Sequence, residues 1–437
     1  MMEDPRYSKI GKVYNGFGTF QLKSVLIKND AGDWGTEPNE NAVGIIRSTN
    51  FNNNGKLDLS DIAYRTLSPQ KFEDKKLSSS DILIERSGGS DTQPVGRIGY
   101  ITDDMTDKKL SFANFIQRIS LDETVDAKFV YYCLQQMYEM GITASMQFQT
   151  TGIRNLDWKF YLKTYLPKPT KEEQTAIANI LSKVDEAIAS VQNSITAAER
   201  LKKSLMQNLL TGKMKPDGTF RTSEEFYIDE NFGKVPVGWE VKRGTEITTK
   251  ITKGQSPKWQ GFDYQQEGIL FVTSENIQNG YIDISKPKYL PLEFNNKIRN
   301  SQLEKGDILI NIVGASIGRC AIFNIDIECA NINQAVCVFR PDAENDSMFL
   351  SLYLQSETTQ NRLFRTQVET ARANLSLGDF RKFKFVIPQK EEQIKIANRI
   401  NLFDIEREKL IERILVLERL KKSLMQNLLT GKVTIIR

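Results

Sequence analysis

The chain contains no histidine. Histidine is the most common general base and metal ligand near neutral pH, so its absence weakens the case for a hydrolytic triad. Cysteine is also scarce, and the four residues present are Cys133, Cys320, Cys329 and Cys337. Their spacing fits neither a zinc site nor a disulfide framework, and we therefore expect buried, reduced thiols.

Long apolar runs are absent as well. No run reaches the roughly 18 residues that suggest a membrane span, and the first residues lack the basic and then apolar pattern of a signal peptide. We therefore expect a cytoplasmic protein. The formal net charge of +4 and the isoelectric point near 8.6 are compatible with a nucleic-acid partner without requiring one.

The sequence repeats itself. Residues 199–213 return unaltered as residues 418–432, a displacement of 219 residues (418 minus 199). The same displacement relates Glu172 to Glu391 and Asp185 to Asp404. A repeat of this length is a duplicated domain rather than a solenoid unit. We therefore expect two tandem copies of one design with pseudo-twofold symmetry.

The two copies diverge in their first parts. We match Gly44-Ile45 with Gly268-Ile269, and residues 81–84 with residues 307–310. Ala113, Asn114 and Gln117 are matched with Ala330, Asn331 and Gln334. The displacement changes along this part, which indicates insertions and deletions. Each copy thus has a varied first part and a fixed second part.

The fixed parts predict long helices. Apolar residues between 171 and 210 are spaced alternately by three and four, as on a narrow helical stripe. Thr170 with Glu173 forms a capping-box pattern, and Gly212 is a suitable residue for the end. Forty residues make a helix of roughly 60 Å. The two helices are expected to pair as an antiparallel coiled coil, or alternatively each packs only on its own domain.

Several residues of these helices invite specific hypotheses. Arg407 replaces Ile188 on the stripe, so it reaches the edge, pairs with an acid, or sets the register. The lysine pairs at 202–203 and 421–422 either touch phosphate or, as we favour, are solvated and complement the helix dipole. The identity of residues 204–213 with residues 423–432 includes polar positions, which indicates one partner surface presented twice. The residues predicted for the helix seam or partner surface are Leu201, Leu205, Leu209, Leu420, Leu424 and Leu428.

The varied parts predict mixed α/β modules. Short β-rich runs lie near residues 44–47, 81–85, 268–273, 307–312 and 335–339, and helical patterns cover residues 128–140 and 347–364. Loops at 47–50, 86–93, 253–260 and 273–276 are rich in amide, hydroxyl and basic residues. Such side chains read base edges or hold phosphate, although turns demand many of the same residues. The duplicated architecture favours the interpretation that these loops bind DNA.

An ordered set of motifs occurs twice. In the second copy it comprises Val235-Pro-Val-Gly-Trp-Glu240, Asp307-Ile-Leu-Ile310, Gly318-Arg319, Asn374-Leu375, Ile387-Pro388, Glu391-Glu392-Gln393 and Leu428-Leu-Thr-Gly431. In the first copy it comprises Asp81-Ile-Leu-Ile84, Gly96-Arg97, Asn155-Leu156, Leu166-Pro167, Glu172-Glu-Gln174 and Leu209-Leu-Thr-Gly212. The set resembles the specificity subunit of a Type I restriction-modification system. The first copy departs from it, because no Pro-x-Gly-Trp segment precedes it.

This resemblance implies an α+β protein with two target-recognition domains, at 1–165 and 215–385, and two spacer helices, at 166–214 and 386–437. It also implies a subunit without catalytic activity that binds double-stranded DNA at a bipartite, asymmetric site. Its partners would be two methyltransferase subunits and possible restriction motor subunits. S-adenosylmethionine, ATP and magnesium would bind to those partners. In agreement, the sequence has no phosphate-loop motif and no Asn/Asp-Pro-Pro-aromatic methyltransferase motif.

The candidate DNA-facing residues come from the loops and the paired motifs. They are Arg47, Asn50, Arg97, Gln117, Lys253, Gln255, Lys258, Thr273, Asn276, Arg319 and Gln334. We predict no catalytic residue and no metal ligand. The alternative function is a coiled-coil adaptor that binds two copies of a protein without reading DNA.

Overall fold

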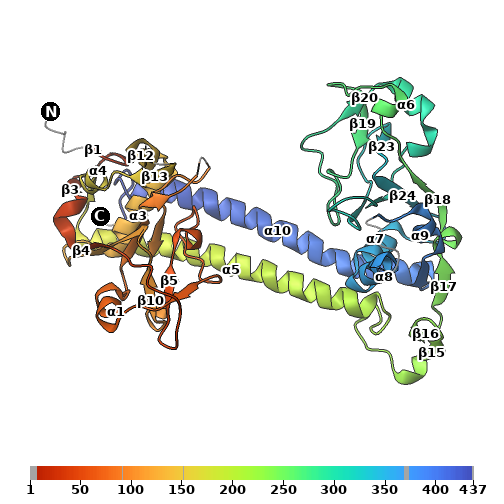
Figure 1. Cartoon of the computed structure of the whole chain (residues 1–437), viewed down its shortest axis with the longest axis horizontal. Helices are drawn as coiled ribbons and strands as arrows, with labels where there is room; N and C mark the ends of the chain where they lie inside the picture. The colour runs from red at the N-terminus through yellow and green to blue at the C-terminus, as the bar shows by residue number, and fades with distance from the viewer. Residues whose placement is uncertain (1–6, 91, 151, 369–373, 436–437) are drawn as a thin grey trace. The chain divides into compact units, whose positions relative to one another are not determined.

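The computed structural model describes residues 7–90, 92–150, 152–368 and 374–435. These residues fall into two compact units. The first unit holds the residues up to Gln192 together with those from Glu412 onward, and the second runs from Asn193 to Ile411. Each unit contains one mixed α/β module and part of each long helix (Figure 1). The repeat in the sequence is therefore a repeat of modules.

The two long helices are α5 (Lys171–Leu209) and α10 (Lys390–Leu428), of 39 residues each. A capping box starts α5, because the Thr170 N–H donates to the Glu173 carboxylate at 3.0 Å and the Glu173 N–H donates to the Thr170 hydroxyl at 3.3 Å. Gly212 and Gly431, shortly after the two helices, have left-handed φ values of 67° and 72°. The end signals that we found in the sequence are confirmed.

Within each unit, the start of one long helix packs near the end of the other. The buried cluster of the first unit includes Ile177, Leu181, Met425 and Leu428, and that of the second includes Ile396, Ile400, Leu209 and Leu210. In the second unit Lys202 pairs with Asp404, and Glu199 pairs with Arg407. Residue numbers rise on one helix as they fall on the other, so the helices are antiparallel there.

The lysines at the helix ends correct one expectation. Lys202 Nζ lies 2.6 Å from Asp404 Oδ1, and Lys421 Nζ lies 2.8 Å from Asp185 Oδ1. The two ion pairs are counterparts under the repeat, and Lys421 is only 8% exposed. Lys202 and Lys421 are therefore paired across the helices rather than solvated, whereas Lys203 and Lys422 are exposed, as expected. Arg407 pairs with an acid at the exposed edge, as one of our alternatives proposed.

The buried apolar stripe is not continuous along the two helices. Leu209 and Leu428 are buried, and Leu205 and Leu424 are partly buried in the same clusters. Leu201 and Leu420, however, are 53% and 46% exposed, so they lie outside the seam, and a place on the partner surface stays a prediction for them. The stripe is thus interrupted at Leu201 and Leu420 and is buried again at Leu209 and Leu428, where each helix end packs into the core of a module.

The first module is built from small sheets. A four-stranded antiparallel sheet has the order β4 (Leu26–Ala31), β11 (Ile116–Leu121), β7 (Ile82–Glu85), β9 (Ile98–Tyr100). A second sheet has the order β10 (Leu110–Phe112), β5 (Val43–Ile46), β6 (Ala63–Arg65), with β5 and β10 parallel. The other pairings are β12 (Gln147–Thr150), β13 (Ile153–Leu156) and β8 (Ser87–Gly88); β14 (Tyr165–Lys168) with β3 (Gly18–Gln21); and β1 (Tyr7–Ser8) with β2 (Gly11–Lys12). The helices are α1 (Pro69–Lys75), α2 (Asp103–Thr106), α3 (Ala127–Glu139) and α4 (Trp158–Leu162).

The second module repeats this plan. Its four-stranded antiparallel sheet has the order β18 (Thr248–Lys253), β24 (Val336–Pro341), β21 (Ile308–Asn311), β22 (Cys320–Ile322). Its second sheet has the order β20 (Tyr289–Leu290), β19 (Ile269–Val272), β23 (Ala330–Ile332), with β19 and β23 parallel. Further pairs are β17 (Glu240–Arg243) with β25 (Lys384–Ile387), and β15 (Phe226–Asp229) with β16 (Gly233–Pro236). The helices are α6 (Leu292–Lys297), α7 (Ser347–Gln355), α8 (Glu357–Val368) and α9 (Leu377–Lys382).

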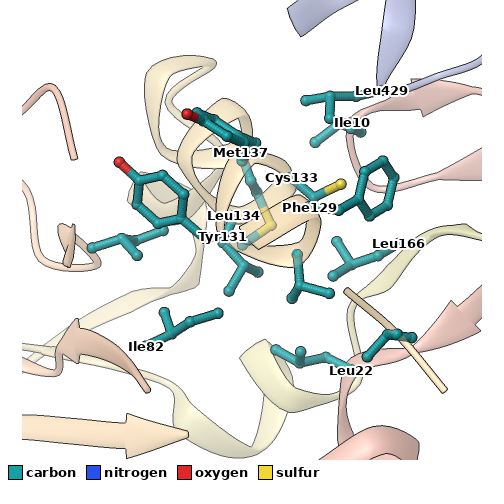
Figure 2. Packing of buried hydrophobic residues seen from close by; sticks show 14 of the residues in the cluster. Ile10, Leu22, Ile82, Phe129, Tyr131, Cys133, Leu134, Met137, Leu166 and Leu429 are labelled. Carbon is teal, nitrogen blue, oxygen red and sulfur yellow. The ribbon is translucent and has the colours of Figure 1, made fainter. Parts of the chain in front are cut away.

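Helix α3 is central to the core of the first unit. Its first turn is capped by Asp126, whose carboxylate accepts the Phe129 N–H at 2.9 Å. Figure 2 shows Phe129, Cys133 and Met137 of α3 in the same cluster as Leu429, the residue directly after α10, and the cluster also includes Leu428, the last residue of that helix. The helix end thus contributes to the core of the module. Of the four cysteines, all of them free, three are buried as expected, but Cys329 is partly exposed.

Strand pairing corrects two of our matches between the copies. Gly44 lies within β5 opposite Leu110. The counterpart of Gly44 in the second module is Leu270, which lies within β19 opposite Ala330. The counterpart of Ala330 is therefore Leu110 rather than Ala113. Gly268 has a φ of 138° and precedes its strand, so the shared glycines were misleading. Short apolar strands look alike under a shift, and only their hydrogen bonds fix the register.

The start of the first module also has a counterpart that the sequence concealed. The Phe17 N–H donates to the Tyr14 carbonyl, as the Trp239 N–H does to the Pro236 carbonyl, each at 3.0 Å. A Cβ on Gly431 would meet the Phe17 ring at 2.9 Å, and one on Gly212 would meet Pro236 at 2.2 Å. The segment from Tyr14 to Phe17 therefore takes the place of the Pro-x-Gly-Trp segment.

Candidate nucleic-acid interface

The main sheet of the second module aligns the ends of its four strands. The register places Lys253 opposite Cys337, Cys337 opposite Ile310, and Ile310 opposite Cys320. These residues lie at or next to the ends of their strands. The connecting segments that carry Gln255, Gln334 and Arg319 therefore leave the sheet at one end.

The smaller sheet brings its own loop to the same place. The Asn333 N–H donates to the Val272 carbonyl at 3.1 Å, and the Asn311 amide donates to the Ser274 carbonyl at 2.9 Å. The loop that follows β19 is thus joined to the end of β21. Six candidates of this module lie at or next to this end of the sheets, and they are Lys253, Gln255, Thr273, Asn276, Arg319 and Gln334. Lys258, the seventh candidate, lies further along the loop that follows β18.

The gathered residues divide into exposed and buried groups. The exposed residues are Lys253, Gln255, Lys258, Arg319 and Gln334. Thr273 and Asn276 are only 4% and 9% exposed. The Asn276 side chain accepts the Thr273 N–H at 2.8 Å and donates to the Asp283 carbonyl at 2.9 Å. These two residues hold the loop in shape, and their assignment as DNA-facing is wrong.

Asn50 has the same structural role in the first module. Its side chain accepts the Arg47 N–H at 2.9 Å and donates to the Asp58 carbonyl at 2.8 Å, and it is 2% exposed. It is therefore a turn residue and not a base reader. Arg47 itself keeps about a third of its side chain exposed and pairs with Asp61 at 2.9 Å.

Arg97 and Arg319 are counterparts with opposite environments. The Glu85 N–H donates to the Arg97 carbonyl, and in the second module the Asn311 N–H donates to the Arg319 carbonyl in the same way. Arg97 is 6% exposed and forms two hydrogen bonds to the Glu85 carboxylate, at 2.7 and 2.8 Å. Burial alone would lower the pKa of Arg97, but the hydrogen bonds and charge of Glu85 raise it above its ordinary value.

The second module lacks this buried acid. Asn311 stands where Glu85 stands in the first module, and a neutral amide cannot balance a guanidinium. Arg319 is exposed, and its hydrogen bond is to the Gln278 side chain at 3.0 Å. Arg319 thus presents its charge at the strand end, whereas Arg97 is committed to the interior. The expectation that Arg97 faces DNA is wrong.

Gln117 is also an interior residue. It is 4% exposed, and its amide donates to Asn29 at 2.8 Å. It lies opposite Ile84, as Cys337 lies opposite Ile310, so Gln117 is not the counterpart of Gln334. The Ala113 N–H donates to the Ile46 carbonyl, as the Asn333 N–H does to the Val272 carbonyl, so Ala113 and Asn333 are counterparts. The residue after Ala113, Asn114, is therefore the counterpart of Gln334.

Asn114 and Arg86 are exposed residues that our candidates omitted. Asn114 directly follows Ala113, whose N–H forms the hydrogen bond that both modules share. Arg86 directly follows β7, at the same end of the sheet. Arg86 begins the polar loop at 86–93, in which position 91 lies outside the described residues. Correct strand register would have identified Asn114, and the end of the Asp81–Glu85 run would have identified Arg86.

The chemistry of these strand ends is that of recognition. They present guanidinium, ammonium and amide groups, which pair with base edges and phosphates. Among the described residues, no group of three or more histidine, cysteine, aspartate or glutamate side chains is arranged to hold a metal ion. In the same part of the chain, no helix is long and apolar enough to cross a membrane.

The duplicated fold and its two polar strand ends define a recognition protein rather than an enzyme. The family described as the Type I restriction modification DNA specificity domain matches residues 15–200 and again residues 236–419. The chain belongs to this family. Its role is therefore DNA sequence specificity within a restriction-modification system, as a subunit that does not itself catalyse a reaction.

Two specificity subunits and one solved structure are similar to this chain over much of their own length. The MjaVIII specificity subunit of Methanocaldococcus jannaschii is 29% identical over 66% of this chain and 67% of its own. The putative MjaX specificity subunit of the same organism is 23% identical over 99% of this chain and 97% of its own. A solved structure of a Type I S subunit from M. genitalium shares the fold, with a TM-score of 0.53 and 18% identity, covering 97% of this chain and 99% of that chain.

Proposed function

We propose that the chain reads a bipartite, asymmetric DNA site, with one half-site for each module. The observation that carries the proposal is the gathering of exposed basic and amide residues at one end of the repeated sheets, above all Arg319, Gln334 and Lys253. Arginine pairs bidentately with guanine and glutamine with adenine, while lysine holds phosphate.

The two modules offer different chemistry on one scaffold. The second module exposes Arg319 where the first buries Arg97, and it presents Gln334 where the first presents Asn114. Since base readout depends on the donors and acceptors offered, the two half-sites should differ. The paired helices would fix the distance between the modules.

The repeated helix ends support a role in assembly. Residues 204–213 and 423–432 are identical, including exposed polar positions such as Gln207 and Gln426. Packing against the modules does not require such identity at exposed positions, but two copies of one partner would. We propose two methyltransferase subunits and, for restriction, motor subunits as these partners. S-adenosylmethionine, ATP and magnesium would bind to those subunits.

Replacing Arg319 by Gln tests the readout directly. With the modification partners present, we expect affinity for the target to fall about tenfold to a hundredfold, because one good bidentate contact contributes roughly 1–3 kcal/mol of discrimination. The loss should depend on the base opposite Arg319 and should be confined to the second half-site. Arg319→Lys is the matched control, since a phosphate contact would survive it and a bidentate base contact would not.

Exchange of the first module tests the division of labour. Replacing the residues up to about 150 with the corresponding module of a relative should change one half of the methylated sequence and leave the other half unchanged. Strand-resolved methylation mapping reads both halves at once. A change in both halves, or in neither, would contradict the assignment of one half-site to each module.

A protein adaptor remains the second candidate because of one cleft in the second unit. This cleft of 950 Å³ lies beside α5, and its lining combines apolar residues, including Met206 and Phe232, with charged residues, including Lys203 and Glu357. Exposed apolar surface with a polar rim is typical of interaction sites, including those for a protein. Filter binding at several salt concentrations separates the two functions, since phosphate contacts produce a steep fall of affinity with salt.

A further inference from the structure

One exposed aromatic side chain has no role in the fold. Trp259 is 84% exposed and belongs to the short 3-10 helix Lys258–Gln260, in the loop between β18 and β19. Within the described residues, its indole forms no hydrogen bond and no ring contact. Tryptophan has a large apolar surface that proteins usually bury or use for binding.

The loop that carries Trp259 is held in place from several sides. The Gln260 amide donates to the Gln255 side chain at 2.7 Å, and the Phe262 N–H donates to the Pro257 carbonyl at 3.0 Å. Lys297 donates to the Gln260 carbonyl at 3.1 Å. Phe262 stacks edge-on against the buried Phe294 with ring centroids 5.5 Å apart. The indole is therefore presented by a fixed loop.

The first module also has a tryptophan in the segment that follows the first strand of its main sheet, and it packs that side chain. Gly32 and Gly254 are counterparts, because a Cβ on either would lie 2.0 Å or less from a strand carbonyl, that of Phe112 or Ile332. Trp34 lies two residues after Gly32, whereas Trp259 lies five residues after Gly254. Trp34 is partly buried and lies under the Arg65 guanidinium at 4.9 Å. A tryptophan at this end of the sheet is thus packed inside one module and left bare in the other.

The surroundings of Trp259 identify its ligand. Lys253 ends β18, Lys258 precedes Trp259 directly on the loop that follows, and both lysines are exposed. The Gly254 N–H donates to the Asn333 carbonyl, next to Gln334, so the start of this loop lies at the proposed DNA-facing end. A bare indole beside an exposed lysine on this loop suits a nucleic acid, in which the lysines meet phosphates and the ring stacks on a base. Bases of an intact duplex are already stacked, so an indole reaches a base face only by opening a base step.

We propose that Trp259 is a wedge that enters a base step of the second half-site and partly unstacks it. This inference rests on the proposed function of DNA readout. The wedge would add affinity without naming a base, and it would distort the duplex on the side of the second module. It would thereby make the second half-site sensitive to the deformability of one step, because flexible pyrimidine–purine steps open more easily than others.

The test uses the full chain assembled with its methyltransferase partner and a duplex of the mapped target. The probe is 2-aminopurine, placed in turn at each position of the second half-site. We expect the native complex to raise its fluorescence at one step, and Trp259→Ala to abolish that rise and weaken binding roughly 5- to 100-fold. Trp259→Phe, which keeps a smaller ring, should retain part of both effects.

The control is Ile228→Ala, which removes a side chain that is 74% exposed on β15 of the same unit, and it should change neither quantity. An unchanged fluorescence rise and affinity in Trp259→Ala would overturn the wedge and leave DNA readout standing. Loss of the methyltransferase partner from Trp259→Ala, seen as a lower complex mass, would instead mark a protein-docking residue and also overturn it. A native complex that binds no specific DNA would overturn both proposals.

Discussion

Replacing Arg97 by Ala should destabilise the first unit by about 3–5 kcal/mol, because it leaves the Glu85 carboxylate buried without its partner. Glu85 is fully buried, and the guanidinium provides two of its hydrogen bonds. The same guanidinium donates to the Phe51 carbonyl at 2.6 Å and to the Ser48 carbonyl at 3.0 Å. The loop that follows β5 should therefore loosen together with the sheet.

The measurement is urea unfolding followed by a probe in each unit, since a chain with two units need not unfold in one step. Arg319→Ala is the matched control. It removes the counterpart residue, whose exposed side chain has no buried acid beside it, and we expect a change within about 0.5 kcal/mol. Equal losses of stability in the two variants would contradict the contrast between a structural arginine and a binding arginine.

A double replacement of Arg97 and Glu85 by Met separates charge from packing. Buried ion pairs replaced by apolar residues of similar volume are often as stable as the original or more so. We therefore expect the double variant to recover much of the stability that Arg97→Ala loses. A double variant as unstable as Arg97→Ala would indicate that the hydrogen bonds to the loop carbonyls matter more than the ion pair.

The sequence was sufficient for the plan of the fold. The 219-residue repeat, the helical stripe and the capping signals located two long helices and two modules, because each signal is local and occurs twice. The polar loops were also found, since amide and basic residues between apolar strands mark connections at a sheet edge. The strand pairings then show that those loops meet at one end of each module.

The sequence was not sufficient to separate readers from structural residues. Asn50, Asn276 and Thr273 have the composition of base readers, but their side chains satisfy backbone groups of their own loops. Arg97 and Arg319 occupy the same motif, and only the partner at the end of the neighbouring strand, Glu85 or Asn311, decides their roles. That partner lies on another strand, so the distinction depends on tertiary contact.

Lengthening both long helices by one turn should lengthen the spacer of the target by about two base pairs. Four residues add about 6 Å of helix, and one base pair rises by roughly 3.4 Å. The insertions are placed near Ser194 in α5 and near Arg413 in α10, which are counterparts under the repeat. They then fall between Asp185 and Lys202 on one helix, and between Asp404 and Lys421 on the other.

Because of this placement, both interhelical ion pairs, of Lys202 with Asp404 and of Lys421 with Asp185, keep their partners in the double insertion. An insertion in α5 alone is the control: it leaves the two helices unequal in length, so both pairs cannot be kept, and modification should fall sharply. Methylation mapping reads the spacer directly. An active double insertion that modifies the original spacing would show that the helices do not set the distance between half-sites, while the readout by each module would be unaffected.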